Sequence, residues 1–476
     1  MVGMLAPNSD LMLVYAAFAV LALFIASGLA AALHRRKNVA FLIGLPLLAI
    51  DTALFLSVFT GGSSTTLLGI FEMYPFSALF AALFMASGTL IYLISYRYSN
   101  DFTGFSALFG FMLLGVIGVA ASTSLVTTVV GIELVALSTV FMIILDGKSR
   151  VEPAVKLFIL GAIAISVLLF AVAMMFSYDP SLLLSGFTAS GPAPGSYILT
   201  LAIILFIAGF SFEASLFPFN LWVPDVYQGA PTNITAMLAG MNKKVAFVAI
   251  MTTFFVLLSR YSATFSPIFE LLAILTMFFG NIMAFVQKDV KRLFAYSSIS
   301  QAGYILIGIA VADSFGIEAS IVQIAAHMFM VIGAFSVVLW LESKGLRSID
   351  DYSGLGYRSK FAGISLSIFM LSMAGVPPLL GFTGKLLLFS SAVDKGMLIL
   401  AGLGILNSFM SIYYYGKVIG SMYSKKGVSV GSGKLFANGY IIAAVAVCLA
   451  VVVLFGLYPG PIIHAASAAS LSLFGM

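Results

Sequence analysis

The chain has 476 residues, of which 61% are hydrophobic and only 9% are charged, whereas soluble domains carry about 25% charged residues. This composition excludes an ordinary soluble domain and indicates a membrane protein whose surface contacts lipid. The net charge of +5 would suggest nucleic-acid binding in a soluble protein. In a membrane protein it reflects the loops that face the cytoplasm, so we expect no nucleic-acid partner.

Apolar stretches of about 20 residues, the length that crosses the hydrocarbon core of a bilayer, predict an all-α polytopic membrane protein. About fourteen transmembrane helices are expected. In chain order, their approximate ranges are 11–33, 39–60, 75–96, 104–121, 124–145, 154–177, 197–219, 232–258, 264–286, 290–311, 317–341, 361–392, 395–420 and 436–458.

Fourteen crossings place both termini on the same side of the membrane. The loops on the other side hold 17 of the 23 Lys and Arg residues, whereas the terminal side holds two, Arg260 and Lys395. Loops rich in Lys and Arg face the cytoplasm. We therefore expect a multi-pass protein of the cell (cytoplasmic) membrane whose termini are non-cytoplasmic, with the loops at 342–360 and 417–434 inside the cell.

Seven of the ionisable residues inside predicted spans draw attention, because a charge costs about 2.5–3.5 kcal/mol at the membrane centre. This cost indicates a function for most of them. Lys156 could instead extend to the membrane surface because it lies near a helix start, and Asp51 could be a neutral acid or bind a backbone group. Lys243 and Lys244 are about 100° apart on a helix, so only one can point at a given interior site. The seven are Asp51, Glu133, Lys156, Glu213, Lys243, Lys244 and Lys385.

The seventh and twelfth spans contain proline where a plain helix should not. Pro218 follows Glu213 by five residues, and Pro377–Pro378 is followed by Gly381 and Gly384. Inside a membrane, such breaks are tolerated only where protein or water satisfies the freed backbone groups. Two independent proline kinks would explain them, but corresponding breaks also mark an ion site between inverted repeats.

The breaks are five helices apart, which predicts two five-helix units of opposite orientation. The expected divisions are an N-terminal three-helix segment (1–103), a first antiporter-like repeat (104–258), a second inverted repeat (259–420) and a C-terminal segment with helix 14 (421–476). The tenth helix begins with a run of hydroxyl and amide side chains from Ser297 to Gln301. This run could line a hydrated path or bind neighbouring helices.

A single cysteine, Cys448, provides no partner for a disulfide and no ligand set for an iron–sulfur cluster. Three histidines, His34, His327 and His464, cannot supply paired axial ligands for a membrane cytochrome. We expect this chain to bind no metal and no redox cofactor, so any electron transfer belongs to another subunit.

Four segments resemble the antiporter-like subunits of respiratory complex I, in order from about helix four to helix thirteen. The run Pro-Asp-Val-Tyr-Gln-Gly-Ala-Pro at 224–231 and the triple tyrosine at 413–415 favour the N type over the sister types L and M. The full segments are 218–232, 291–298 (Lys-Arg-Leu-Phe-Ala-Tyr-Ser-Ser), 374–385 and 407–415.

The resemblance implies a proton-pumping module with fourteen helices, inverted repeats and broken helices 7 and 12. It also implies a row of ionisable residues in mid-membrane. Glu133 matches the glutamate of helix five in this family, Lys243 the lysine of helix eight, and Lys385 the lysine of helix twelve. His327 lies where the N type tends to have tyrosine and the sister types have histidine.

One position departs from the family. The lysine of helix seven is replaced by Glu213, and Asn220 stands where a histidine is usual. Two nearby glutamates cannot easily both be ionised. Either Glu213 and Glu133 share a proton, which we favour, or Lys244 or Lys156 supplies the missing cation to Glu213.

The sequence thus predicts a proton-translocating, non-redox subunit of a complex I-like quinone or phenazine oxidoreductase. Its partners are expected to be sister antiporter-like subunits, with quinone, flavin and iron–sulfur clusters on partner subunits. One alternative is a subunit of a multi-subunit cation/proton antiporter or of a membrane-bound hydrogenase. The other alternative is a scaffold subunit that does not pump protons. The retained Glu133 and Lys385 argue against a scaffold, whereas the lost lysine of helix seven argues for one. The expected relay residues are Glu133, Lys243, His327 and Lys385, with Glu213, Lys244 and Lys156 as further path residues.

Overall fold

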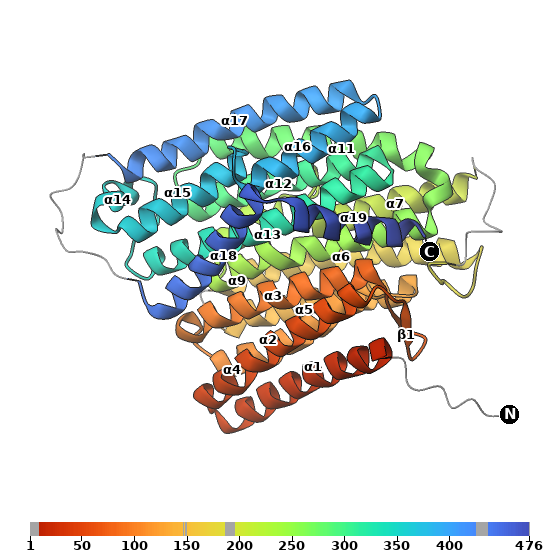
Figure 1. Cartoon of the computed structure of the whole chain (residues 1–476), viewed down its shortest axis with the longest axis horizontal. Helices are drawn as coiled ribbons and strands as arrows, with labels where there is room; N and C mark the ends of the chain where they lie inside the picture. Colours follow the sequence, from red (N-terminus) through yellow and green to blue (C-terminus); the bar gives the residue numbers. More distant parts are fainter. Residues whose placement is uncertain (1–8, 146, 148–149, 186–195, 425–436, 476) are drawn as a thin grey trace.

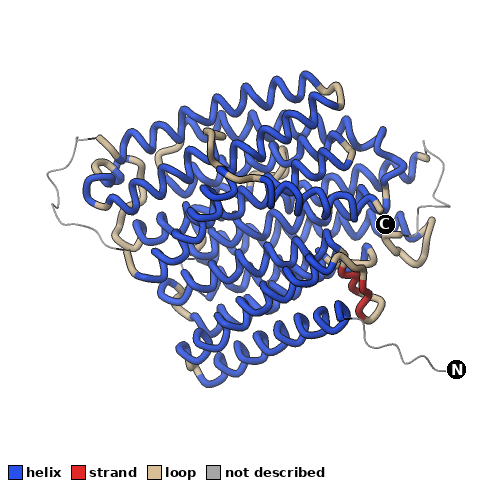
Figure 2. Tube along the Cα trace, in the orientation of Figure 1, coloured by secondary structure: helices blue, strands red, loops and turns tan. Residues whose placement is uncertain are grey.

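The computed structural model describes residues 9–145, 147, 150–185, 196–424 and 437–475, and most of these residues are helical (Figure 1, Figure 2). The first half contains α1 (Ser9–His34), α2 (Lys37–Gly61), α3 (Pro75–Tyr98), α4 (Phe102–Ala120), α5 (Leu125–Leu145), α6 (Val151–Phe176), α7 (Tyr197–Ala214), α8 (Trp222–Gly229) and α9 (Thr232–Met237). The helices η2 (Leu238–Asn242), α10 (Lys243–Thr252) and η3 (Thr253–Leu257) continue α9 as one span.

The second half begins with η4 (Ser259–Tyr261). It continues with α11 (Ser262–Phe285), α12 (Val290–Val311), α13 (Ser314–Glu342), η5 (Asp350–Tyr352), α14 (Leu355–Arg358), α15 (Lys360–Ala374), α16 (Leu380–Asp394), α17 (Leu398–Met422), α18 (Gly439–Leu457) and α19 (Gly460–Phe474). Within the described residues, thirteen continuous helical segments are long and apolar enough to cross a membrane. The shorter α15 and α16 together occupy the predicted twelfth span, so the predicted polytopic all-α fold is confirmed.

The backbone has the same geometry at the two helix breaks. α7 ends before Ser215 and α15 ends before Gly375, and both residues have positive φ angles, 63° and 90° respectively. Three residues further on, each break contains a proline preceded by a cis peptide bond, Pro218 in one and Pro378 in the other. The breaks at helices 7 and 12 are therefore confirmed, whereas the repeat boundaries remain a prediction.

The helices α8 and α19 and a short hairpin are among the elements that were not predicted from the sequence. The predicted loop at 220–231 contains α8, because Pro224 lies in the first helical turn, where its missing N–H costs little. A hairpin of β1 (Thr65–Leu67) and β2 (Phe71–Met73) follows α2. α19 follows the last predicted span, packs against α13 and α3, and was missed because its 15 residues are too few for a crossing.

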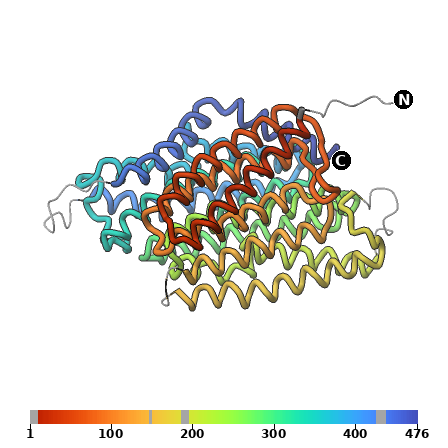
Figure 3. The backbone as a smooth tube through the Cα atoms, turned by 90° about the horizontal axis from the view of Figure 1, so that it is seen from below, coloured from red at the N-terminus to blue at the C-terminus, as the bar shows by residue number. Residues whose placement is uncertain are grey.

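The centre of the bundle is formed by α12, α13 and the span from Thr232 to Leu257, which are the most enclosed of the described spans. By contrast, α1, α6 and α18 are largely exposed, as expected for helices that face lipid or other subunits. Figure 3 shows α6 running along one edge of the molecule. Lys243, Lys244 and His327, which lie on two of these elements, are therefore shielded from both water and lipid.

Two of the connections that were expected to share a side lie at the same end of the bundle. The turn between α1 and α2 and the short helix α14 are at the left in Figure 1, whereas the β1–β2 hairpin is at the right. This arrangement agrees with the predicted alternation of loops. Residues 425–436 of the predicted loop at 417–434 lie outside the described residues.

Candidate functional site

Lys243 is a buried cation at the first position of α10, directly after the π-helical turn η2. π-helical turns are frequent at functional sites. The Lys243 Nζ atom donates to Ser298 Oγ on α12 at 3.1 Å and lies 5.0 Å from the centroid of the Tyr227 ring. In the described part of the chain no carboxylate forms an ion pair with Lys243. Its charge is therefore stabilised by a hydroxyl and an aromatic face rather than by an ion pair.

Lys244 points to a different partner from Lys243, as expected from their 100° separation. Its Nζ atom lies 2.7 Å from His327 Nδ1 and also donates to the Ala239 carbonyl. When Lys244 is an ammonium group it can only donate, so that Nδ1 accepts and the neutral ring carries its proton on Nε2. This contact joins the span that carries both lysines to α13, the helix that carries His327.

Lys385 lies beside the second helix break. Its Nζ atom donates to the Ala374 carbonyl at 3.1 Å and to Ser408 Oγ at 2.9 Å, and it lies 4.3 Å from the centroid of the Tyr304 ring. The Ala374 carbonyl is one of those that the end of α15 leaves without a helical donor, and helix C-termini attract cations. A cavity of about 230 Å³ lined by Lys385, Gly375 and Ser408 adjoins the site.

Glu213 and Glu133 approach each other from α7 and α5. Both side chains are half-buried, and the Glu133 carboxyl acts electrostatically on Glu213. Neither glutamate forms an ion pair within the described residues. The structure therefore brings the two acids together without the lysine that the alternative interpretation required.

Lys156 does not reach Glu213. Its Nζ atom pairs with Glu152 at 3.0 Å and with Asp225 of α8 at 3.1 Å, and the side chain is 43% exposed. Asp225 also accepts from Arg292 at 2.9 Å. Burial alone would raise the pKa of Asp225, but hydrogen bonds from Arg292 and Lys156 outweigh burial and lower it. Lys156 thus takes part in a surface ion network instead of the mid-membrane row.

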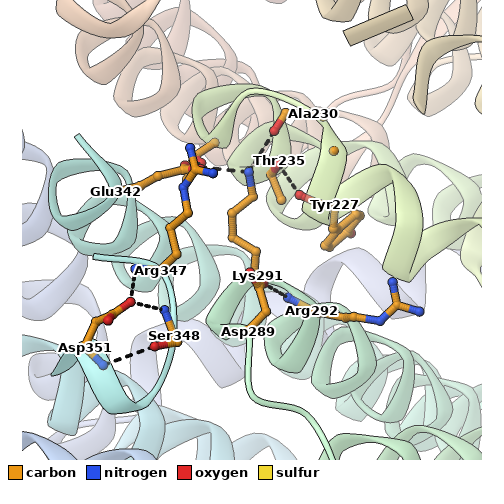
Figure 4. Close-up of polar contacts among 12 residues, drawn as sticks. Tyr227, Ala230, Thr235, Asp289, Lys291, Arg292, Glu342, Arg347, Ser348 and Asp351 are labelled. Atoms are coloured by element: carbon orange, nitrogen blue, oxygen red, sulfur yellow. Dashed lines mark hydrogen bonds and ion pairs between the residues drawn. The ribbon is translucent and has the colours of Figure 1, made fainter. Parts of the chain in front are cut away.

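A second ion network lies deeper, at the C-terminal end of α8 (Figure 4). The buried Lys291 donates to the Ala230 carbonyl at 2.8 Å and lies 3.6 Å from Glu342 Oε2. Glu342 also accepts from the Thr232 hydroxyl and pairs with Arg347 at 3.4 Å. The network fixes the start of the Lys243 span against α12 and α13. From the sequence, Lys291 was counted among the loop charges. Its partners Ala230 and Glu342 are distant in sequence, so the sequence did not indicate these contacts.

Several buried polar groups lack partners among the described residues. Both carboxyl oxygens of Asp51 and both amide atoms of Asn220 make no hydrogen bond, and the same holds for His327 Nε2 and Gln323 Oε1. Unpaired buried groups are rare in proteins and indicate water, a ligand or a functional role. Gln323 was not singled out from the sequence, although an amide in an otherwise apolar span was a visible signal.

Residues 122–411 match the protein family described as "NADH:quinone oxidoreductase/Mrp antiporter, TM". The chain is 33% identical over 441 residues to NADH-quinone oxidoreductase subunit N of Desulfitobacterium hafniense, an alignment that covers 87% of this chain and 88% of that protein. It is also 33% identical over 413 residues to F(420)H(2) dehydrogenase subunit N of Methanosarcina mazei, with 83% and 84% covered.

The fold is similar to a solved chain of respiratory complex I from Thermus thermophilus with bound aureothin. The TM-score is 0.82, the sequence identity is 26%, and the match covers 95% of this chain and 99% of that chain. The similarity extends beyond the antiporter-like segments to nearly the whole of both chains.

Proposed function

The chain belongs to the family of membrane subunits shared by NADH:quinone oxidoreductases and Mrp antiporters, and we propose that it translocates protons in the membrane arm of a complex I-like oxidoreductase. The observation that carries this proposal is a row of buried titratable groups. Lys243, Lys244, His327 and Lys385 are all buried, and Lys244 Nζ lies 2.7 Å from His327 Nδ1. Such an arrangement is costly in a membrane and of little structural value, so it supports a transport role.

The residues suggest a relay across the two broken helices. Glu133 and Glu213 share a proton at one end, and Lys243 exchanges it through hydroxyl groups and water. The Lys244–His327 contact passes charge to the second unit, and Lys385 releases the proton beside the break after α15. Because these sites interact, a change of charge at one alters the proton affinity of the next. A redox event elsewhere in the complex then drives the relay through this coupling.

The redox chemistry in this proposal belongs to other subunits. Flavin, iron–sulfur clusters and the quinone or phenazine site are assigned to partner subunits, and this chain contributes no redox cofactor. Sister antiporter-like subunits are its direct partners. We place the chain in the cell membrane with its termini outside the cytoplasm.

A subunit of a cation/proton antiporter is the second candidate, because the family description covers Mrp antiporters as well. The two functions differ in their partners. Mild-detergent purification through a tag on this chain should recover flavin- and iron–sulfur-containing subunits if the first proposal is right. Recovery of other membrane subunits alone, without redox-active subunits, would favour the antiporter.

The proton-translocating role can be tested with Lys243→Met, which keeps the length of the side chain and removes its charge. We expect the reconstituted variant complex to lose most of its proton translocation while its subunit composition is unchanged. Lys344→Met changes an exposed lysine in the connection after α13 and serves as the matched control. Normal translocation by Lys243→Met would contradict the proposed role of this lysine.

A further inference from the structure

Three consecutive cations lie at the turn between α1 and α2. Arg35 and Arg36 separate the two helices, and Lys37 is the first residue of α2. Within the described residues, none of the three forms an ion pair. By contrast, Lys156 and Arg292 both have carboxylate partners. The turn therefore carries positive charge that the described part of the chain does not neutralise.

A cavity of about 500 Å³ adjoins this turn, and we call it the cationic pocket. Arg35 and Lys37 line it from the connection between α1 and α2, whereas Asp101 and Thr103 line it from the connection between α3 and α4. Sites for small ligands usually have volumes of about 300–1,000 Å³. The pocket is therefore large enough for a ligand, and two cations form one of its walls.

Asp101, the acid among the lining residues, is engaged by α4. Its Oδ1 atom accepts from the Thr103 hydroxyl at 2.8 Å and from the Gly104 N–H at 3.0 Å. Its Oδ2 atom faces the same turn, because a Cβ atom on Gly104 would lie 2.7 Å from it. The carboxylate thus caps α4 and makes no ion pair with Arg35 or Lys37. The cations of the pocket remain available to an anion.

The side chain of Lys37 is positioned by aromatic rings. Its Nζ atom lies 4.9 Å from the centroid of the Tyr96 ring and 5.9 Å from that of the Phe102 ring. The Tyr96 hydroxyl donates to Asn38 Oδ1 at 2.8 Å, which ties this ring to the start of α2. Cation–π contacts hold an ammonium group but leave its charge in place. Lys37 is thus held at the pocket as a donor.

The helices on both sides of the turn expose apolar side chains. Leu33, near the end of α1, is 84% exposed, and Leu42, in the second turn of α2, is 69% exposed. Most of the length of both helices is also exposed. In a bilayer such faces contact acyl chains. The cationic pocket therefore lies at the level where the acyl chains end and the lipid headgroups begin.

We propose that the cationic pocket binds the phosphate of an anionic phospholipid whose acyl chains lie along the exposed faces of α1 and α2. The Arg35 guanidinium can donate to two phosphate oxygens at once, and Lys37 supplies a point charge. A lipid is favoured over a free phosphate ion because the apolar faces adjoin the pocket, and basic pockets at the ends of transmembrane helices bind lipid headgroups. This inference goes beyond the proposed function and does not depend on the proton relay.

The backbone at Arg35 supports a role for its side chain and supplies a sharp variant. Its φ angle is 52°, a conformation that favours glycine and costs free energy for other residues. The chain nevertheless has an arginine at this position. Arg35→Gly removes the charge and relieves this backbone cost, so a loss of lipid binding in this variant cannot be attributed to unfolding.

Lipid binding is measured in the whole complex, reconstituted in vesicles of equal parts phosphatidylcholine and phosphatidylglycerol. Leu33→p-benzoylphenylalanine places a photo-crosslinker beside the pocket, and mass spectrometry identifies the lipid adducts. We expect adducts enriched in phosphatidylglycerol relative to the vesicles. Arg35→Gly should reduce this enrichment about fivefold, whereas Arg35→Lys keeps the charge and should retain it. Adducts that match the vesicle composition, or equal enrichment with and without Arg35→Gly, would overturn the proposal.

Two further arms of the experiment establish what the pocket recognises. Lys344→Met is the matched control, since it removes an exposed cation in the connection after α13 and should leave the enrichment unchanged. Added inorganic phosphate, at constant ionic strength, should also leave it unchanged because a free ion lacks acyl chains. Loss of enrichment in Lys344→Met would indicate a general effect of net charge, and loss on adding phosphate would indicate a site for free anions. Either result would overturn the assignment to a lipid.

Discussion

The Nζ atom of Lys244 lies 2.7 Å from Nδ1 of His327, and this contact links the span behind the first helix break to α13. Lys243, the lysine that matches the family, faces Ser298 instead. The two adjacent lysines therefore contact different helices: Lys243 contacts α12 and Lys244 contacts α13. The Lys244–His327 contact connects the histidine to the row of buried ionisable residues.

The Lys244–His327 contact predicts different effects for two substitutions of the histidine. His327→Ala leaves a buried ammonium without its partner, which is expected to destabilise the protein by about 3–5 kcal/mol and to reduce assembly. His327→Gln keeps an acceptor for Lys244 but cannot titrate. We expect it to assemble normally and to pump poorly, as measured by subunit yield and by vesicle acidification.

Glu213 gives a prediction that distinguishes a shared proton from an ion pair. If Glu213 and Glu133 share a proton, Glu213→Gln replaces a neutral acid with a neutral amide and should reduce pumping only mildly. Glu213→Lys, which restores the residue usual in the family, should also be tolerated. Severe loss of assembly with Glu213→Gln would indicate a lysine paired with Glu213, and a comparison of complex yield and pumping rate decides between the two cases.

Much of this arrangement could be predicted from the sequence because the membrane imposes simple constraints. The spans follow from the length of apolar runs, and the breaks follow from Pro218 and Pro377–Pro378. The separate directions of Lys243 and Lys244 follow from helix geometry. These features depend on residues that are close in sequence.

The partners of the buried groups could not be predicted in the same way. The contact of Lys244 with His327 spans 83 residues, and the pair Lys291–Glu342 spans 51. Such contacts depend on how the helices pack. The short helix α8 was missed because proline and glycine at its ends are also typical of a loop.

The ion network around Asp225 predicts a pH-dependent contribution to stability. The lowered pKa of Asp225 means that folding favours its ionised form relative to the unfolded chain, whose pKa is about 3.9. The contribution is therefore present above about pH 4 and is lost as the pH falls through the lower folded-state value. Because Asp225 is 42% exposed, each pair contributes at most about 1 kcal/mol.

Asp225→Asn should accordingly lower the apparent Tm of the purified complex slightly at pH 7. The difference from the wild type should be the same at pH 5 and should shrink only below pH 4. Thermal scans in detergent across this range provide the measurement. A difference that grows as the pH falls would contradict the assigned charge of Asp225.

The topology predicts which positions an impermeant thiol reagent reaches. The native Cys448 is fully buried, and Cys448→Ala removes any background. In that variant, Lys344→Cys should be labelled only from the cytoplasmic face and Asp394→Cys only from the opposite face. Both positions are exposed. Labelling of both from one face would show that the number of crossings between them is wrong.

The central claim is that buried lysines carry the translocated protons, and Lys385→Ala tests it most directly. Lys385 adjoins a cavity beside the helix break, and the partners of its Nζ atom among the described residues are a carbonyl, a hydroxyl and an aromatic ring. Its removal should therefore leave the complex assembled. The measurement is the number of protons translocated per two electrons transferred in vesicles. We expect a clear decrease relative to the wild type and to Lys344→Met, and an unchanged ratio at an unchanged rate of electron transfer would contradict the account.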